Sequence, residues 1–188
     1  MKTYFLPSIR ITIVLIVLCA GLYPLLVAAV GKLTPGGGDG VAVTVNGKVV
    51  GYANVGQKFT KDKYFNSRPS AADYKADASA GSNKGPTNPD YLKDVEKRID
   101  TFLVHNPGVK RADIPAELVT ASGSGLDPDL SPAGAKIQAA RIARVRGLAV
   151  DKVLALVDAH TQKPLWGLFG PEKVNVLQLN VALDEVKP

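Results

Sequence analysis

The first strong pattern in the chain is a run of twenty residues without a charged side chain, from Ile11 to Val30. A helix rises about 1.5 Å per residue, so this run spans about 30 Å, the thickness of a bilayer's hydrocarbon core. Backbone amides find no water there, and a helix satisfies them internally. Pro24 removes one of these hydrogen bonds and is expected to kink the helix. The pattern predicts a membrane-spanning helix over residues 11–30.

A cleavable signal peptide is the alternative to a retained anchor. Its apolar core is usually about 7–15 residues long, and this run is longer, which favours the anchor. Ala28, Ala29 and Gly31 nevertheless offer small residues at which a peptidase acts. Cys19 is the only cysteine, but the bulky Leu18 before it and the apolar run after it argue against a lipid-modified cysteine. The rest of the chain therefore has neither disulfides nor cysteine metal sites.

The charges that flank the apolar run predict its direction. Lys2 and Arg10 precede the run, whereas Lys32, partly offset by Asp39, follows it. The positive-inside rule places the more basic side in the cytoplasm. We expect a cytoplasmic tail (residues 1–10), the span (11–30), a glycine-rich flexible linker (31–40) and one extracytoplasmic domain (41–188).

Turn and capping residues predict two elements early in the domain. Ala42 to Val50 is expected to form a β-hairpin, because Asn46-Gly47 suits a type I′ turn, in which both central residues need positive φ. A helix is expected to begin after Asn88, with Asn88 as N-cap and Pro89 in the first turn. It should end at the Asn106-Pro107-Gly108 sequence.

The second half of the domain predicts two more helices and a strand. By the same capping argument, one helix should run from Ser131 to Gly147. Apolar residues at helical spacing predict another from about Val150 to Ala159. Apolar and polar residues alternate from Val174 to Leu183, which is typical of a half-buried strand, and we expect this strand to pair with the hairpin. The expected fold is α+β (or α/β), with a small sheet and about three helices.

A long segment, Thr60 to Pro89, has almost no apolar periodicity. Its composition would leave it disordered alone, so the rest of the domain or a partner must order it. Two interpretations stay open, a loop packed on its own core and a docking surface. Arg68 stands before a proline in an otherwise uncharged stretch and is suited to bridging carbonyls or a carboxylate, either within the loop or on a partner.

Charge and motifs exclude several classes of function. The chain has 23 basic and 17 acidic residues, a net charge of +6, without the stripe of basic and aromatic residues typical of nucleic-acid binding. No Walker loop or aspartyl-phosphate motif is present. A serine hydrolase would need Ser122 or Ser124, a base from His105 or His160, and Asp127, but neither serine lies in a G-x-S-x-G sequence. Asp127 and Asp129 favour a turn over a cation site.

Several separate motifs occur in one order along nearly the whole chain. Besides the N-terminal span, they are Gly56 to Phe59, Tyr64-Phe65, Arg68 to Ser70, Gly81 to Asn83, Gly85 to Pro89, Leu118 to Pro128, Gln138 with Arg141, Arg146-Gly147, Val174 to Leu177, Leu179-Asn180 and Ala182 to Asp184. Together they resemble the C subunit of the bacterial Kdp potassium-transporting P-type ATPase. Departures from that family's pattern fall at Tyr52, Asn54 and Asp129.

The resemblance implies a non-catalytic subunit of a high-affinity potassium uptake complex in the bacterial inner membrane. The partners would be a channel-like potassium-selective subunit, a P-type ATPase subunit, a small single-span subunit and the lipid bilayer. The family's C subunit is needed for assembly and is described as a catalytic chaperone that raises the ATP affinity of the ATPase subunit. A membrane-anchored extracytoplasmic binding module is the alternative that we keep.

The resemblance also implies site residues, with no metal ligand among them. The positions ascribed to nucleotide contact are Ser122, Gly123, Ser124, Gly125 and Gln138. Because ATP is cytoplasmic and the domain is expected outside, direct ATP contact conflicts with this topology, and a conformational effect through the complex is favoured. The positions expected to order the loop or to meet a partner are Gln57, Phe59, Tyr64, Phe65, Arg68, Asn83 and Asn88.

Overall fold

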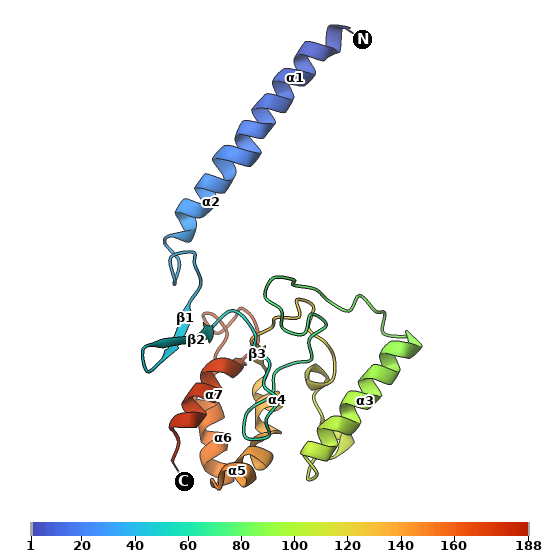
Figure 1. The fold of residues 1–188 in the computed structure, drawn as a ribbon, viewed down its shortest axis with the longest axis vertical. Coiled ribbons are helices and arrows are strands. Elements are labelled where there is room, and N and C mark those ends of the chain that lie inside the picture. The colour runs from blue at the N-terminus through green and yellow to red at the C-terminus, as the bar shows by residue number, and fades with distance from the viewer. Residues whose placement is uncertain (1, 188) are drawn as a thin grey trace. The chain divides into compact units, whose positions relative to one another are not determined.

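The structure, a computed structural model, describes residues 2–187, and the side chains of residues 3–187 (Figure 1). The chain divides into two compact units, Met1–Ala42 and Val43–Pro188.

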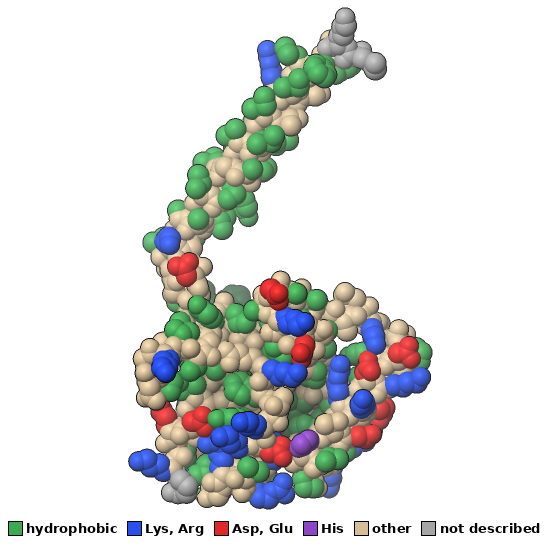
Figure 2. All heavy atoms as spheres, viewed as in Figure 1, with side chains coloured by type: hydrophobic (Ala, Val, Ile, Leu, Met, Phe, Trp, Pro, Cys, Tyr) green, Lys and Arg blue, Asp and Glu red, His purple; other side chains and the backbone are tan. Residues whose placement is uncertain are grey.

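The first unit is one helical run. It consists of α1 (Lys2–Ile16), six π-helical residues (Val17–Leu22) and α2 (Tyr23–Gly31). The π-helical residues precede Pro24, and the N–H of Tyr23 donates to the Leu18 carbonyl, so the backbone adjusts where proline offers no donor. The helix over Thr3–Gly31 is long and apolar enough to cross a membrane. Hydrophobic side chains line the face of this helix that Figure 2 shows. The predicted apolar helix is confirmed, and it begins earlier than expected.

The second unit opens with the predicted hairpin. Strand β1 (Ala42–Val45) pairs with β2 (Lys48–Tyr52) in a two-stranded sheet. Asn46 and Gly47 between them have φ values of 51° and 76°, which confirms the turn with two positive φ angles. No regular helix or strand then occurs in residues 53–88, all of which the structure describes.

Four short helices surround most of the core. They are α4 (Pro132–Lys136), α5 (Ala139–Arg146), α6 (Val150–Ala159) and α7 (Val176–Glu185), and the other three all contact α6. The buried apolar side chains come from these helices, from two short strands described below and from irregular segments. The largest that are almost fully buried are Phe65, Leu130, Ile142, Val153, Val157, Val174, Val176, Leu179 and Leu183.

The helix predicted over 131–147 is divided in two at Ile137 and Gln138. Its start and end are confirmed, because Ser131 accepts a hydrogen bond from the Gly134 N–H and Gly147 has a left-handed φ of 68°. At the division, the Gln138 side-chain amide donates to the Gly134 carbonyl, which would otherwise accept from the Gln138 backbone N–H. That N–H bonds instead to Ala135, three residues back, which tightens the turn.

A second sheet has three short antiparallel strands in the order β3-β5-β4. They are β3 (Asp129–Leu130), β4 (Thr161–Gln162) and β5 (Lys173–Asn175). Leu130 and Thr161 both lie opposite Val174 on the central strand. The prediction that the last strand pairs with the hairpin is therefore wrong, because β5 has its partners in this separate sheet.

The prediction of a strand over Val174 to Leu183 is also wrong beyond its first residues, since Val176–Glu185 forms α7. The Asn175 side chain caps this helix by accepting from the Gln178 N–H at 3.1 Å. The buried face of the helix includes Asn180, which is only 2% exposed. The sequence pattern resembles a strand because Asn180 counts as an exposed polar residue in the alternation, although it is in fact buried.

Helix α3 (Pro89–His105) begins and ends where the sequence predicts. Asn88 caps it by accepting from the N–H groups of Asp90 and Tyr91. No residue of α3, all of which the structure describes, is buried. In Figure 1 the helix lies apart from α4–α7, with irregular chain between them. Side chains of α3 line a cavity, and the site described next lies there. The overall class is α+β, as expected.

Candidate functional site

The site is organised by an arginine. In the described part of the chain, Arg141 on α5 is the one buried charged side chain, at 3% exposed. All five N–H groups of its guanidinium donate to oxygen atoms. Nε donates at 3.1 Å, and the two bonds from Nη2 are both 2.8 Å. The acceptors are the side-chain oxygens of Asn106, Asn66 and Gln138 and the backbone carbonyls of Asp62 and Tyr64.

The positive charge of Arg141 is stabilised mainly by the dipoles of neutral amide and backbone carbonyl groups. The Asp62 carboxylate lies 4.0 Å from Nη1 and closer, at 2.8 Å, to Nδ1 of His105. Burial lowers the pKa of the Arg141 guanidinium because the charged form loses hydration, and the Asp62 charge opposes this shift. The five neutral acceptors therefore provide most of the compensation for burying the charge.

Two buried amides hold the neighbouring backbone. The Asn180 side chain on α7 accepts from the Phe65 N–H at 2.9 Å and donates to the Phe65 carbonyl at 3.0 Å. The Gln138 side chain does the same for Asn66, accepting at 2.8 Å and donating at 3.2 Å. Each amide thus occupies both backbone groups of one residue, as an adjacent strand would. We call residues 57–70, which these side chains hold in place, the anchored segment.

Aromatic side chains complete the attachment of the anchored segment. Phe65 is fully buried in the core, and the Phe59 and Tyr64 rings pack against each other with centroids 5.7 Å apart. The Tyr64 hydroxyl donates to Asp184 on α7 at 2.9 Å. Arg146 on α5 bonds the same carboxylate and donates to the Lys63 carbonyl at 2.7 Å. The sequence prediction for Gln57 concerns the same segment, and its side chain donates to the Val50 carbonyl at 3.0 Å.

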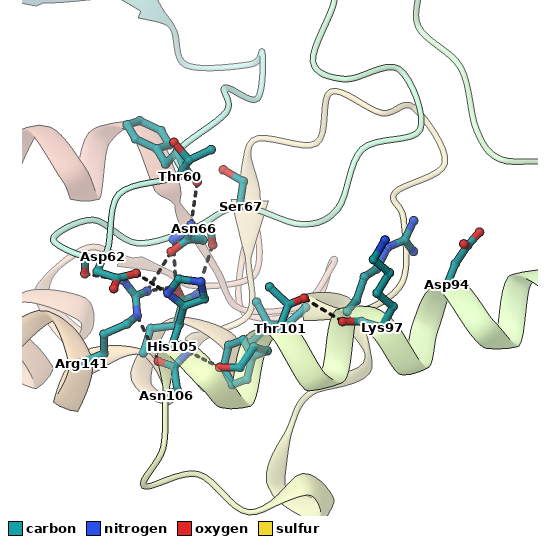
Figure 3. A pocket seen from close by; sticks show the side chains of 15 residues that line it. Thr60, Asp62, Asn66, Ser67, Asp94, Lys97, Thr101, His105, Asn106 and Arg141 are labelled. Carbon is teal, nitrogen blue, oxygen red and sulfur yellow. Dashed lines mark hydrogen bonds and ion pairs between the residues drawn. The ribbon is translucent and has the colours of Figure 1, made fainter.

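A cavity of about 620 Å³ lies between the anchored segment and α3. Figure 3 shows Asp62, Asn66, His105, Asn106 and Arg141 converging at one end of it, with Lys97 and Asp94 further along α3. The wall carries both cationic and anionic side chains together with the rings of two phenylalanines, Phe59 and Phe102. Because the Arg141 donors are all occupied, a ligand in this cavity would meet the α3 side chains and the hydroxyls of Thr60, Ser67 and Thr101.

The other end of the anchored segment is held by the Ser122–Asp127 turn. Arg68 Nη1 forms an ion pair with Asp127 at 2.8 Å, and the Ser70 hydroxyl donates to the Gly125 carbonyl at 2.7 Å. The Ser122 N–H donates to the Pro69 carbonyl. Arg68 therefore has a partner within its own domain. Its Nε is buried and has no hydrogen-bond partner among the described residues.

The positions ascribed to nucleotide contact lie in two separate places. Ser122 to Gly125 form the turn just described, whereas Gln138 is fully buried beside Arg141, with its amide bonded to Asn66 and Gly134. The Ser122 hydroxyl accepts from the Gly125 N–H, and the Ser124 carbonyl accepts from the Ala80 N–H. Nucleotide contact by these residues stays a prediction.

The residues of the possible hydrolase are not brought together by any hydrogen bond that the described structure contains. His105 pairs with Asp62, and the His160 ring bonds the Leu156 carbonyl at 2.9 Å. Asp127 is engaged with Arg68. Within residues 2–187, no group of three His, Cys, Asp or Glu side chains is arranged to hold a metal ion. Asp129 pairs with Lys173 at 2.6 Å, beside the strand β5.

The glycines of the Ser122–Gly125 turn provide a matched test of its packing. Gly125 has a φ of 71°, and a Cβ there would lie 2.8 Å from the Ala80 carbonyl, whereas a Cβ on Gly123 would meet nothing within 4 Å. We expect Gly125→Ala to lower the free energy of unfolding by about 1–3 kcal/mol, since both the backbone conformation and the contact are unfavourable. Gly123→Ala should change it by less than about 0.5 kcal/mol. Chemical denaturation of both variants measures this, and equal effects would contradict the packing described.

Asn88 lies at the start of α3, as the sequence predicts, and Asn83, another predicted residue, adopts a positive φ of 52°. Three further asparagines of the site, Asn66, Asn106 and Asn180, were not among the predicted residues. Their signal was weak but present in one respect, because Asn180 lies three residues after Leu177 and three before Leu183, on what would otherwise be an apolar helix face. A buried amide in that position requires a hydrogen-bond partner. A long segment without secondary structure has backbone N–H and C=O groups that require hydrogen-bond partners too.

Comparison with known proteins identifies the family. The family model described as "KdpC: K+-transporting ATPase, c chain" matches residues 5–185. A Potassium-transporting ATPase KdpC subunit from Bacteroides fragilis is 55% identical over 190 residues, covering 100% of this chain and 99% of that protein. The protein of that name from Flavobacterium johnsoniae is 54% identical over 187 residues, covering 100% of both chains. One from Caldanaerobacter subterraneus is 45% identical over 182 residues, covering 96% of this chain and 94% of the relative.

Proposed function

Since the chain belongs to the KdpC family, the c chain of the K+-transporting ATPase, we propose that it is an accessory, non-catalytic subunit of a potassium-transporting ATPase complex. The observation that carries the proposal is similarity over the whole chain, which includes both the apolar helix and the complete second unit. The helix Thr3–Gly31 would anchor the subunit in the bacterial inner membrane beside its partners.

The second unit would lie outside the cytoplasm. Lys2 and Arg10 give the N-terminal side of the helix more positive charge than Lys32 and Asp39 give the other side, and the more basic side stays in the cytoplasm. A reporter that is active only outside the cytoplasm, fused after Pro188, tests this orientation. Activity is expected; a silent reporter, together with activity of a reporter that works only in the cytoplasm, would overturn it.

In this orientation the subunit would act by assembly and coupling. The potassium-selective subunit presents its external mouth on the same side as the second unit, whereas ATP is bound on the opposite side. An effect on the ATP affinity of the ATPase subunit would therefore be a coupling free energy transmitted through the complex. The occupied donors of Arg141 and the buried amide of Gln138 support this over direct nucleotide contact.

The anchored segment would give the domain a fixed surface to present to its partners. A segment with no helix or strand usually keeps much conformational entropy, which it would lose on binding a partner. Here buried side chains fix its backbone, so this entropy is already lost when the domain folds. The segment would then need little further ordering when subunits associate, which favours a stable complex.

Co-purification tests the proposed assembly. With a tag after Pro188 and solubilisation in a mild detergent, a channel-like subunit, a P-type ATPase subunit and a small single-span subunit should be recovered with the chain. A tagged chain cut after the apolar helix controls for capture through the membrane segment alone. Recovery of the intact chain without any of these subunits, together with binding of a small external solute, would instead favour the anchored binding module.

A further inference from the structure

A short loop between β4 and β5 exposes four large hydrophobic side chains within residues 165–169. Leu165, Trp166, Leu168 and Phe169 are 61%, 82%, 81% and 61% exposed. Such a concentration is unusual on a soluble surface, where large apolar side chains are exposed singly, and it marks a site of interaction. We call residues 165–169 the apolar tip. It lies outside the core cluster, the anchored segment and the cavity along α3.

The apolar tip is a closed, ordered turn. The N–H groups of Leu165 and Phe169 each donate to the other residue's carbonyl at 3.0 Å. Trp166 and Gly167 at its end both have positive φ, of 54° and 73°. The rings of Trp166 and Phe169 meet edge to face, with centroids 6.0 Å apart. Its backbone is thus partly satisfied by itself, which suits entry into a layer that is poor in water.

We propose that the apolar tip inserts into the interfacial layer of the lipid bilayer in which the chain is anchored. Tryptophan prefers the level of the headgroups, because its apolar ring leaves water there while its N–H keeps a hydrogen bond. Leucine and phenylalanine reach the acyl boundary. Of the charged residues beside the tip, Lys163 suits anionic headgroups, whereas Lys173 is already paired with Asp129 and Glu172 is acidic.

The linker to the apolar helix keeps a bilayer within reach of the tip. Ten residues, 32–41, separate the end of α2 from the start of β1. Even fully extended, they span at most about 35 Å. The second unit is therefore held close to the membrane surface at high effective concentration, and contacts that are weak alone become well populated. This contact does not require the other subunits, so it stands or falls separately from the proposed complex.

Trp166 is the only tryptophan, so its own fluorescence reports the contact. The full-length chain is reconstituted into phosphatidylethanolamine and phosphatidylglycerol vesicles, with or without brominated acyl chains. Brominated lipid should remove at least about half of the Trp166 emission, because an interfacial side chain lies within about 10 Å of the acyl boundary. Aqueous iodide should quench it weakly, and Leu168→Ser should weaken the lipid quenching.

A matched control moves the reporter. In a Trp166→Phe, Val104→Trp variant, the tryptophan replaces a residue on α3 that is 77% exposed, and iodide rather than brominated lipid should quench it. Strong iodide quenching of Trp166 without lipid quenching would overturn the proposal. So would shielding of Trp166 that arises only when the other subunits are added, which would assign the tip to a protein partner.

Discussion

Replacing Arg141 with methionine should lower the free energy of unfolding by about 3–5 kcal/mol, because several buried oxygen acceptors lose their donor and each one left unsatisfied costs about 1–3 kcal/mol. Methionine approximates the length of the aliphatic part but leaves all five oxygen acceptors of the guanidinium without that donor. Three of the acceptors lie in the anchored segment, so this segment should lose its order first.

The measurement combines thermal unfolding by circular dichroism with hydrogen exchange of residues 57–70. Arg144→Met is the matched control, because Arg144 lies on the same helix but is exposed, and it should change stability by less than about 0.5 kcal/mol. Unchanged protection of the anchored segment in Arg141→Met would show that the arginine does not hold it.

Replacing Gln138 with leucine should have the second large effect, a loss of about 3 kcal/mol or more. The change leaves the Asn66 N–H, the Asn66 carbonyl, the Gly134 carbonyl and one Arg141 donor without their side-chain partner, in a place where the residue itself is fully buried. Each unsatisfied buried group costs about 1–3 kcal/mol, although such effects do not simply add.

This variant also separates two roles for Gln138. If the side chain anchors the backbone, Gln138→Leu should destabilise the purified chain in the absence of any nucleotide, while the exposed Gln162→Leu should not. If it contacts nucleotide, the purified chain should keep its stability and only the ATP dependence of the complex should change. Denaturation of both variants distinguishes these results.

Local signals in the sequence were sufficient for elements with caps and turns. The hairpin turns at Asn46-Gly47, and two helices begin after the N-cap residues Asn88 and Ser131, as the sequence indicates. These signals depend only on backbone conformation and on hydrogen bonds to nearby N–H groups. Helix α6 was predicted instead from apolar residues at helical spacing, and its first residue follows Ala149, which forms no side-chain cap.

Errors arose where distant residues decide the structure. Asn180 occupies a polar place in an alternating pattern, but it is buried because Phe65, 115 residues away, needs its amide. Gln138 divides a helix because its side chain bonds Gly134 while also holding Asn66. No local pattern contains these pairings. The same reason explains why the anchored segment could be recognised as needing a support, but not which side chains provide it.

The potassium-stimulated ATPase activity of the complex, assembled with and without this chain, decides whether the chain is a subunit that the ATPase requires. Activity at low ATP concentration should be lost without the chain and restored by adding it back, while the chain alone should hydrolyse no ATP. The Arg141→Met variant should restore less activity than Arg144→Met, since only the former disturbs the anchored segment. Full potassium-stimulated activity without the chain, at low as well as high ATP, would contradict its role as a subunit that the ATPase requires.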